Sequence, residues 1–270
     1  MSGMIVHRGD APLVVALPHT GTDIPDALAG RWVSPWLTRK DADWWIDQVY
    51  DFVHEMGATT IRTPVSRSVI DVNRDPSGVS LYPGQATTEL CPTTTFDGEP
   101  LYRPGQAPDD AEIGERRTLW FDPYHAAIAA EILRLRDMHP RLVLYDAHSI
   151  RSHVPRLFDG ELPQFNIGSN DGATCDAALS DAVADVCARS GLSHVVNGRF
   201  KGGWTTRYYG RPGEGVHAIQ MELACRGYMT EPDDLSPKTW PSPFDAPRAA
   251  PLQAILRGVL GAALSFALKP

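Results

Sequence analysis

The chain has 270 residues, of which 43% are hydrophobic, so it can bury a sizeable core, and we predict a single domain over residues 1–270. Its formal net charge of -8 argues against nucleic-acid binding, because neutralising phosphates requires a surplus of lysine and arginine. We find neither a secretory leader nor an apolar stretch approaching the roughly 20 residues that span a bilayer, which predicts a cytoplasmic protein without membrane contact. Four cysteines without a CxxC pair predict free thiols rather than disulfides or a zinc knuckle.

The first third of the chain is predicted to form a strand, a helix and two further strands. Residues 13–17 are an apolar run that Pro18 ends, which is typical of a buried strand. Apolar residues recur at three- and four-residue steps from 41 to 56, which predicts an amphipathic helix. Two short runs, 59–63 and 68–72, then predict strands.

Strands and helices alternate again after a long irregular segment. Residues 75–111 are rich in proline, glycine and threonine, so they are expected to form a lid or wall over a site, or else an ordinary surface excursion. The later predicted elements are helices at 112–138, 173–190 and 247–268 and strands at 141–145, 193–196 and 216–223. This alternation predicts a three-layer α/β fold, in which a mixed, mostly parallel sheet carries helices on both faces and sites collect outside the carboxyl ends of the strands.

Two histidines occupy comparable places relative to the predicted strands. His19 follows the first apolar run and His148 follows the run at 141–145, so one sheet could bring both imidazoles together. Two histidines and a carboxylate leave an open position on zinc, where the pKa of a bound water falls to about 7. A single histidine in a loop is more often a surface or hydrogen-bonding residue than a metal ligand, so each histidine alone is weak evidence.

Two carboxylates close to His19 are candidates for a third metal ligand. Asp23 lies four residues after His19, and Asp43 lies near the start of the predicted helix. Asp43 could instead complement the helix dipole, and its neighbour Asp41 is suited to capping the helix. The residues alone leave this choice open.

Two further acids lie on predicted strands or directly after them. Asp146 precedes His148 by two residues, so on an extended backbone it points to the same side, where it could orient the imidazole or accept backbone hydrogen bonds. Glu222 lies in a mostly apolar run, where burying an ionisable side chain is costly unless it forms an ion pair or has a catalytic role. It could be a general base with a raised pKa or a salt-bridged structural glutamate.

Cationic and amide groups surround Asp71. Arg67, Asn73 and Arg74 offer two planar forks and an amide, a combination suited to recognising carboxylates, although either arginine could instead brace Asp71. A glycine-flanked Thr-Thr-Arg core at Arg207 could approach a ligand closely or form an aromatic surface loop.

Several of these motifs recur as an ordered set at 18–21, 24–25, 41–44, 66–74, 145–149, 200–210 and 220–223. Together, over residues 12–230, they resemble the N-formylglutamate deformylase (N-formylglutamate amidohydrolase) family of histidine degradation. The Asp-x-Asn-Arg and Asp-x-His pieces are also similar to those of aspartoacylase, succinylglutamate desuccinylase and the zinc carboxypeptidases. This wider similarity implies a zinc-carboxypeptidase-like, phosphorylase/hydrolase-like fold with one metal site.

The resemblance implies roles for particular residues. It makes His19 and His148 metal ligands, Glu222 the base that activates water, and Asn73 with Arg74 the clamp on a substrate carboxylate. The wider relatives carry a glutamate three residues after the first histidine, but position 22 is threonine here. Asp43, which lies in one of the matching segments, is therefore expected to be the third ligand.

The implied reaction is the hydrolysis of N-formyl-L-glutamate to formate and L-glutamate. The implied cofactor is one divalent metal, Zn²⁺ in preference to Co²⁺, and Arg67, Arg74 and Arg207 are expected to hold the two substrate carboxylates. The alternatives are hydrolysis of another N-acyl acidic amino acid or small peptide on the same metal site, and a non-catalytic dicarboxylate-binding protein. The sequence does not distinguish a monomer from a homo-oligomer.

Overall fold

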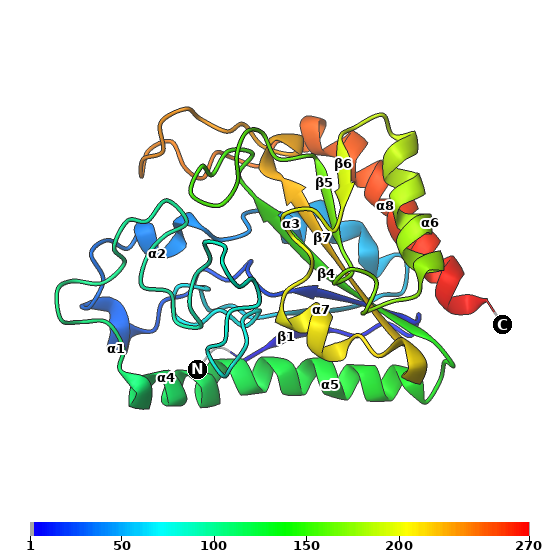
Figure 1. Cartoon of the computed structure of the whole chain (residues 1–270), viewed down its shortest axis with the longest axis horizontal. Helices are drawn as coiled ribbons and strands as arrows, with labels where there is room; N and C mark the ends of the chain where they lie inside the picture. Colours follow the sequence, from blue (N-terminus) through cyan, green and yellow to red (C-terminus); the bar gives the residue numbers. More distant parts are fainter. Residues whose placement is uncertain (1–2, 270) are drawn as a thin grey trace.

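A mixed seven-stranded sheet forms the centre of the protein (Figure 1). The computed structural model describes residues 3–269, so positions 1, 2 and 270 of the predicted domain lie outside the described residues. The strand order is β1-β3-β2-β4-β7-β5-β6. The strands are β1 (Ile5–His7), β2 (Leu13–Leu17), β3 (Thr59–Arg62), β4 (Leu142–Ile150), β5 (Phe165–Gly168), β6 (His194–Val196) and β7 (Val216–Ala224). Over residues 3–269 four pairings are parallel and two, β1 with β3 and β5 with β7, are antiparallel.

Helices cover both faces of this sheet, which is the three-layer α/β architecture predicted from the sequence (Figure 1). The α-helices are α1 (Asp26–Ala29), α2 (Leu37–Lys40), α3 (Ile46–Val49), α4 (Asp110–Arg116), α5 (Asp122–Arg136), α6 (Ala177–Arg189), α7 (Trp204–Tyr209) and α8 (Ala246–Leu268). Successive strand residues point to opposite faces, so Val14 and Leu144 pack with α5 while Val15 and Tyr145 pack with α6 and α8. Strands that are buried on both faces supply both cores.

The strand β4 is longer than predicted, and this places two candidate residues inside the sheet. It continues to Ile150, so Asp146 and His148 lie within the strand rather than after it. In the parallel pairing of β4 with β7, His148 is directly opposite Glu222. The register of the two strands therefore sets the distance between these side chains.

Two other predicted elements were wrong. The helix expected at 41–56 is reduced to α3 at Ile46–Val49 and a 3₁₀ helix at Asp51–His54. Trp45, directly before α3, has a left-handed backbone with φ of 62°, so α3 does not extend back to residues 41–44. The strand expected at 68–72 is not formed. Its backbone is in turns instead, where the amide of Val69 donates to Ser66 and that of Asp71 donates to Leu90.

The C-terminal helix α8 corrects a further expectation. Its 23 residues make it, within the described chain, the one helix long and apolar enough to cross a membrane by length and composition, so the expectation that no segment approaches that length was wrong. Its inner face is buried against α6 and the sheet, through residues that include Leu252, Leu256 and Leu260. That packing is typical of a core helix.

Candidate active site

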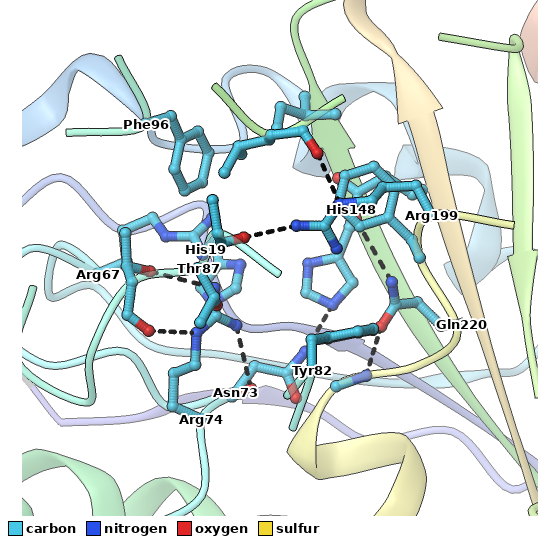
Figure 2. Close-up of a pocket in the computed structure, with 17 residues that line it drawn as sticks. His19, Arg67, Asn73, Arg74, Tyr82, Thr87, Phe96, His148, Arg199 and Gln220 are labelled. Atoms are coloured by element: carbon cyan, nitrogen blue, oxygen red, sulfur yellow. Dashed lines mark hydrogen bonds between the residues drawn. The ribbon is translucent and has the colours of Figure 1, made fainter. Parts of the chain in front are cut away.

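The ends of three neighbouring strands bring the predicted chemical groups to one cavity. His19 follows β2, His148 lies near the end of β4, and Glu222 lies near the end of β7. All three side chains line the same cavity, around which His19 and His148 face one another in Figure 2. The carboxyl edge of the sheet is where the fold class places a site.

Asp43 joins the two histidines in a buried group that could hold a metal ion. Its Oδ2 lies 3.1 Å from His148 Nδ1 and 3.6 Å from His19 Nδ1, and the ligand atoms all lie within 4.8 Å of one another. His19 Nδ1 and Asp43 Oδ1 are buried without a hydrogen-bond partner among residues 3–269. Buried polar atoms are rarely left unpartnered, and imidazole nitrogen with carboxylate oxygen is a donor set that zinc accepts. These residues therefore fit a divalent metal, whereas Asp23 is exposed at the surface.

A carboxylate contacts the far nitrogen of each imidazole. Asp71 Oδ1 lies 2.7 Å from His19 Nε2, and Asp146 Oδ1 lies 3.1 Å from His148 Nε2. Partners of this kind fix the orientation and tautomer of a metal-binding imidazole. Both rings consequently direct Nδ1 toward Asp43. Asp146 contacts the ring that it was expected to orient, while the matching contact of Asp71 was not foreseen.

The ionic state of this group is set by its buried acids. Burial would lower the pKa of His148, but the carboxylates of Asp146 and Asp43 outweigh it and hold that pKa well above its usual value. Burial would raise the pKa of Asp43, but His19 and His148 outweigh it and hold that pKa below its usual value. In the protein without a bound ion, a proton on His148 balances the negative charge of Asp146 and Asp43. A divalent cation could take over that balancing role.

Arg67 is neutralised largely by acids of the protein itself. Its Nη2 lies 2.7 Å from Asp71 Oδ2, and its Nη1 lies 3.5 Å from Asp43 Oδ1. Burial would raise the pKa of Asp71, but Arg67, Arg74 and His19 hold it well below its usual value. The bracing of Asp71, one of the two roles considered for these arginines, is therefore the arrangement that Arg67 adopts.

Glu222 faces the cavity without a cationic partner. It is 8% exposed, and no ion pair to it is formed within the part of the chain that the structure describes. The nearest side-chain donor is Gln220 Nε2, 3.4 Å away. Burial raises the pKa of Glu222 to about 8, against a lowering effect of His148. A carboxyl group of this kind gains and loses its proton near neutral pH, as a group that transfers protons must.

Asn73 is engaged on both sides of its amide. Its Nδ2 donates to Asp146 Oδ2 at 3.0 Å and lies 2.9 Å from His148 Nε2, while its Oδ1 accepts from the backbone amide of Thr205 at 2.7 Å. Gly203 permits this approach, because a Cβ there would lie 2.4 Å from Asn73 Nδ2. The glycine-flanked segment thus begins helix α7 beside Asn73 rather than forming a surface loop.

The arginines that line the cavity differ partly from those expected. Arg67, Arg74 and Arg199 are among the lining residues. Arg207 is not among them, since its Nε donates to the carbonyl of Gly202 and its guanidinium lies over the Tyr82 ring. Sequence reasoning missed Arg199. The available signal was its position directly before the 200–210 motif.

The irregular segment forms one wall of the cavity, as one of the two readings of 75–111 anticipated. Its lining residues are Tyr82, Ala86, Thr87, Thr88 and Phe96. The amide of Phe96 donates to Asp41 Oδ2 at 2.7 Å, and the buried Lys40 forms an ion pair of 2.7 Å with Asp97. Asp41 thus holds this wall rather than capping the start of a helix.

Comparisons with known proteins agree with the motifs and the fold. The family model described as N-formylglutamate amidohydrolase matches residues 11–229. N-formylglutamate deformylase of Pseudomonas aeruginosa is 49% identical over 225 residues, which cover 83% of this chain and 84% of that protein. The protein of the same name from Pseudomonas putida is 45% identical over 231 residues, covering 85% and 86%.

Two solved structures share the fold. The crystal structure of N-formylglutamate amidohydrolase from Ralstonia eutropha JMP134 matches with a TM-score of 0.80 at 22% identity, covering 99% of each chain. A gene product of Agrobacterium tumefaciens matches with a TM-score of 0.73 at 18% identity, covering 100% of this chain and 97% of the other. The chain is thus a hydrolase of an amide bond and belongs to the N-formylglutamate amidohydrolase family.

Proposed function

We propose that this protein hydrolyses N-formyl-L-glutamate to formate and L-glutamate, with a divalent metal held by His19, Asp43 and His148. The observation that carries the proposal is the buried group of two Nδ1 atoms and a carboxylate oxygen, which shares one cavity with Glu222 and cationic side chains. The names of the two Pseudomonas relatives support the substrate.

The proposal includes a cellular setting. The family resemblance supports the last step of a histidine degradation route as the place of this reaction. The four cysteines are free and buried, which supports a reducing compartment such as the cytoplasm.

The chemistry requires activation of water and of the formyl group. Zn²⁺ or Co²⁺ bound at this group supplies Lewis acidity, which lowers the pKa of water and polarises a carbonyl oxygen. The protein contributes the geometry: Asp71 and Asp146 hold the imidazoles by Nε2, so that both Nδ1 atoms are directed inward toward Asp43.

Glu222 is suited to both proton transfers. It accepts a proton from the attacking water while the new bond forms to the formyl carbon, and its raised pKa allows it to hold that proton. When the carbon–nitrogen bond of the tetrahedral intermediate breaks, Glu222 returns the proton to the leaving amine. Arg67, which lies beside Asp43, is the cation placed to stabilise charge on the former carbonyl oxygen.

Arg74 is the cation that we assign to the α-carboxylate of the substrate. It lines the cavity, is anchored by bonds to the carbonyl and hydroxyl of Thr88, and lies 3.7 Å from Asp71. Its contacts to protein acids are thus looser than those of Arg67. Asn73 supports this arrangement by holding Asp146, and Arg207 supports the Tyr82 wall.

An assay of the free amino acid released from a panel of N-acyl amino acids, with formate measured for the N-formyl substrates, tests the proposal with and without a chelator. We expect formate from N-formyl-L-glutamate, loss of turnover on chelation, and recovery with Zn²⁺ or Co²⁺. Faster turnover of acidic amino acids that carry a longer N-acyl group would favour the alternative that the enzyme hydrolyses another N-acyl acidic amino acid. Binding of glutamate without turnover or bound metal would indicate a non-catalytic dicarboxylate-binding protein.

A further inference from the structure

Arg199 enters the cavity from a different direction than the other two arginines. Figure 2 shows Arg67 and Arg74 on one side of His148 and Arg199 on the other. Arg199 follows strand β6 in sequence, whereas the other two come from the turns around Asp71. A ligand lying over His148 would therefore have cationic groups on both sides.

Neutral groups hold Arg199 in place. Its Nε donates to the carbonyl of Leu157 and its Nη2 to the carbonyl of Ala86, each at 2.7 Å. Its guanidinium lies 5.3 Å from the ring centroids of both Tyr82 and Phe200. Carbonyls and aromatic faces orient a guanidinium without cancelling its charge.

The cavity arginines differ in how far their charge is compensated. Arg67 has Asp71 and Asp43 as partners, and Arg74 has Asp71 at 3.7 Å. Arg199 forms no ion pair within 4.0 Å among residues 3–269. Burial lowers the pKa of Arg199 and the charge of Arg74 adds to this effect, while Tyr82 and Glu222 act in the opposite direction. Arg199 and Arg74 are thus two positive charges that line the same cavity, and Arg199 is half-buried without an ion-pair partner in the described chain. An anion bound between the two guanidinium groups would compensate this charge.

We infer that Arg199 binds the side-chain carboxylate of the substrate and thereby sets the preference for N-formyl amino acids with an acidic side chain. This inference rests on the proposed function and adds the residue that distinguishes glutamate from its neutral analogues. With Arg74 on the α-carboxylate and the formyl group near His148 and Glu222, the side-chain carboxylate is the remaining anion of the substrate, and Arg199 is the remaining cation of the lining. A guanidinium whose charge is otherwise unpaired favours a carboxylate over an amide of the same shape.

The test compares kcat/KM for N-formyl-L-glutamate and N-formyl-L-glutamine, which differ only in that charge. In Arg199→Gln we expect kcat/KM for the glutamate substrate to fall about tenfold to a hundredfold, as for a lost hydrogen bond to a charged group, while the glutamine substrate changes by less than about threefold. Arg74→Gln is expected to slow both substrates alike, because both carry the α-carboxylate. Arg199→Lys should restore part of the preference for the acid.

A matched control separates charge recognition from simple bracing of loops. Arg211 also donates to backbone carbonyls, those of Arg207 and Gly210, and lies over the ring of Tyr208, but outside the cavity lining. Arg211→Gln should leave both substrates within about twofold of the unchanged enzyme.

Several results would overturn the inference. Equal losses on both substrates in Arg199→Gln would mean that Arg199 only braces the loops, and a loss of preference in Arg74→Gln alone would assign the side-chain carboxylate to Arg74. Equal use of both substrates by the unchanged enzyme would remove the preference itself while leaving the proposed function intact. Formate release from neither substrate would instead overturn the proposed function.

Discussion

The two sides of the cavity balance their charges differently. On the side of the strand ends, His19, Asp43 and His148 are surrounded by buried acids and by Arg67, so that most charges have a partner within the protein. On the side of the irregular segment, Arg199 is held by neutral carbonyls and aromatic rings. A side chain such as Arg199, whose charge has no ion-pair partner within the described residues, can form an ion pair with a ligand.

This difference in charge balance corresponds to a difference in role: we expect the strand-end side to carry out the reaction and the side of the irregular segment to recognise the substrate. His148 and Glu222 are placed by the parallel register of β4 and β7, and a slip of either strand by one residue would turn its side chain to the other face of the sheet. The wall residues are placed by turns and by individual ion pairs and hydrogen bonds, each of which is weaker than the pairing of two strands. Changes on the strand side should therefore affect metal content and kcat, and changes on the loop side should affect KM and selectivity.

The largest effect is expected from His148→Ala. Removing one of three ligands should reduce metal content from about one ion per chain to nearly none and lower kcat by about a thousandfold or more. Elemental analysis together with formate release measures both quantities. His153→Ala, which alters an exposed histidine, should change neither. Full metal content in His148→Ala would remove His148 from the ligand set.

A smaller loss is expected from Glu222→Gln, with the metal retained. The amide keeps the size of the side chain but cannot take a proton from water, so kcat should fall about a hundredfold or more at an unchanged metal content. This variant separates proton transfer from metal binding on the same side of the cavity. Turnover close to normal would show that another group acts as the base.

The next effect concerns stability and its dependence on pH. Burial raises the pKa of Asp41 to about 6, above the usual value of 3.8, despite opposing effects of Arg151 and the Phe96 amide. The folded state therefore binds the Asp41 proton more tightly than the unfolded state does. This proton binding stabilises the fold fully below about pH 4, and the stabilisation is lost as pH rises through about 6. The loss amounts to about 2–3 kcal/mol.

The variant Asp41→Asn removes that titration, since asparagine can still accept from the Phe96 amide. Relative to the unchanged protein, the variant should gain stability between pH 4 and 7, as measured by urea unfolding at each pH. A constant difference across this range would show that Asp41 does not titrate there.

The smallest effect is expected from loosening the loop-side wall with Asp97→Asn. This change weakens the ion pairs of Asp97 with Lys40 and Arg151, beside the cavity residue Phe96. KM should rise about threefold to tenfold while kcat changes by less than about twofold, because such pairs contribute on the order of 1 kcal/mol. Asp159→Asn, at an exposed acid, is the control. A fall in kcat without a change in KM would contradict the division between the two sides.

The strand side was largely predictable from the sequence, and the loop side was not. Short apolar runs followed by polar groups are a local signal, so His19, His148 and Glu222 could be assigned to one edge of a sheet. Asp43 was chosen over Asp23 through a family resemblance, because the residues alone left that choice open. The left-handed backbone at Trp45, directly before α3, has no sequence signature. The residues 68–72 look like a strand because they are mostly apolar, but they are buried as turn residues: Ile70 and Val72 pack on the α5 side of the sheet together with Leu90 of the irregular segment.

Arg199 shows the limit of local signals most clearly. Its significance depends on its forming no ion pair among the described residues, and the absence of an ion pair is a property of the folded chain. The contact of Asp71 with His19 is of the same kind, because it joins residues 52 positions apart in the sequence. Spacing within a motif cannot reveal either relation.

The residues His19, Asp43 and His148 lie far apart in the sequence, and this separation also affects the order in which the protein can form during synthesis. Asp43 and His148 are 105 residues apart in the chain, and they meet only after β2 and β4 have paired across everything between them. Non-local pairings of this kind form slowly, because a long loop must close before any contact rewards it. In a chain emerging from the ribosome, a metal held by this group as proposed above would thus bind late, and it would stabilise only molecules whose central sheet is already complete.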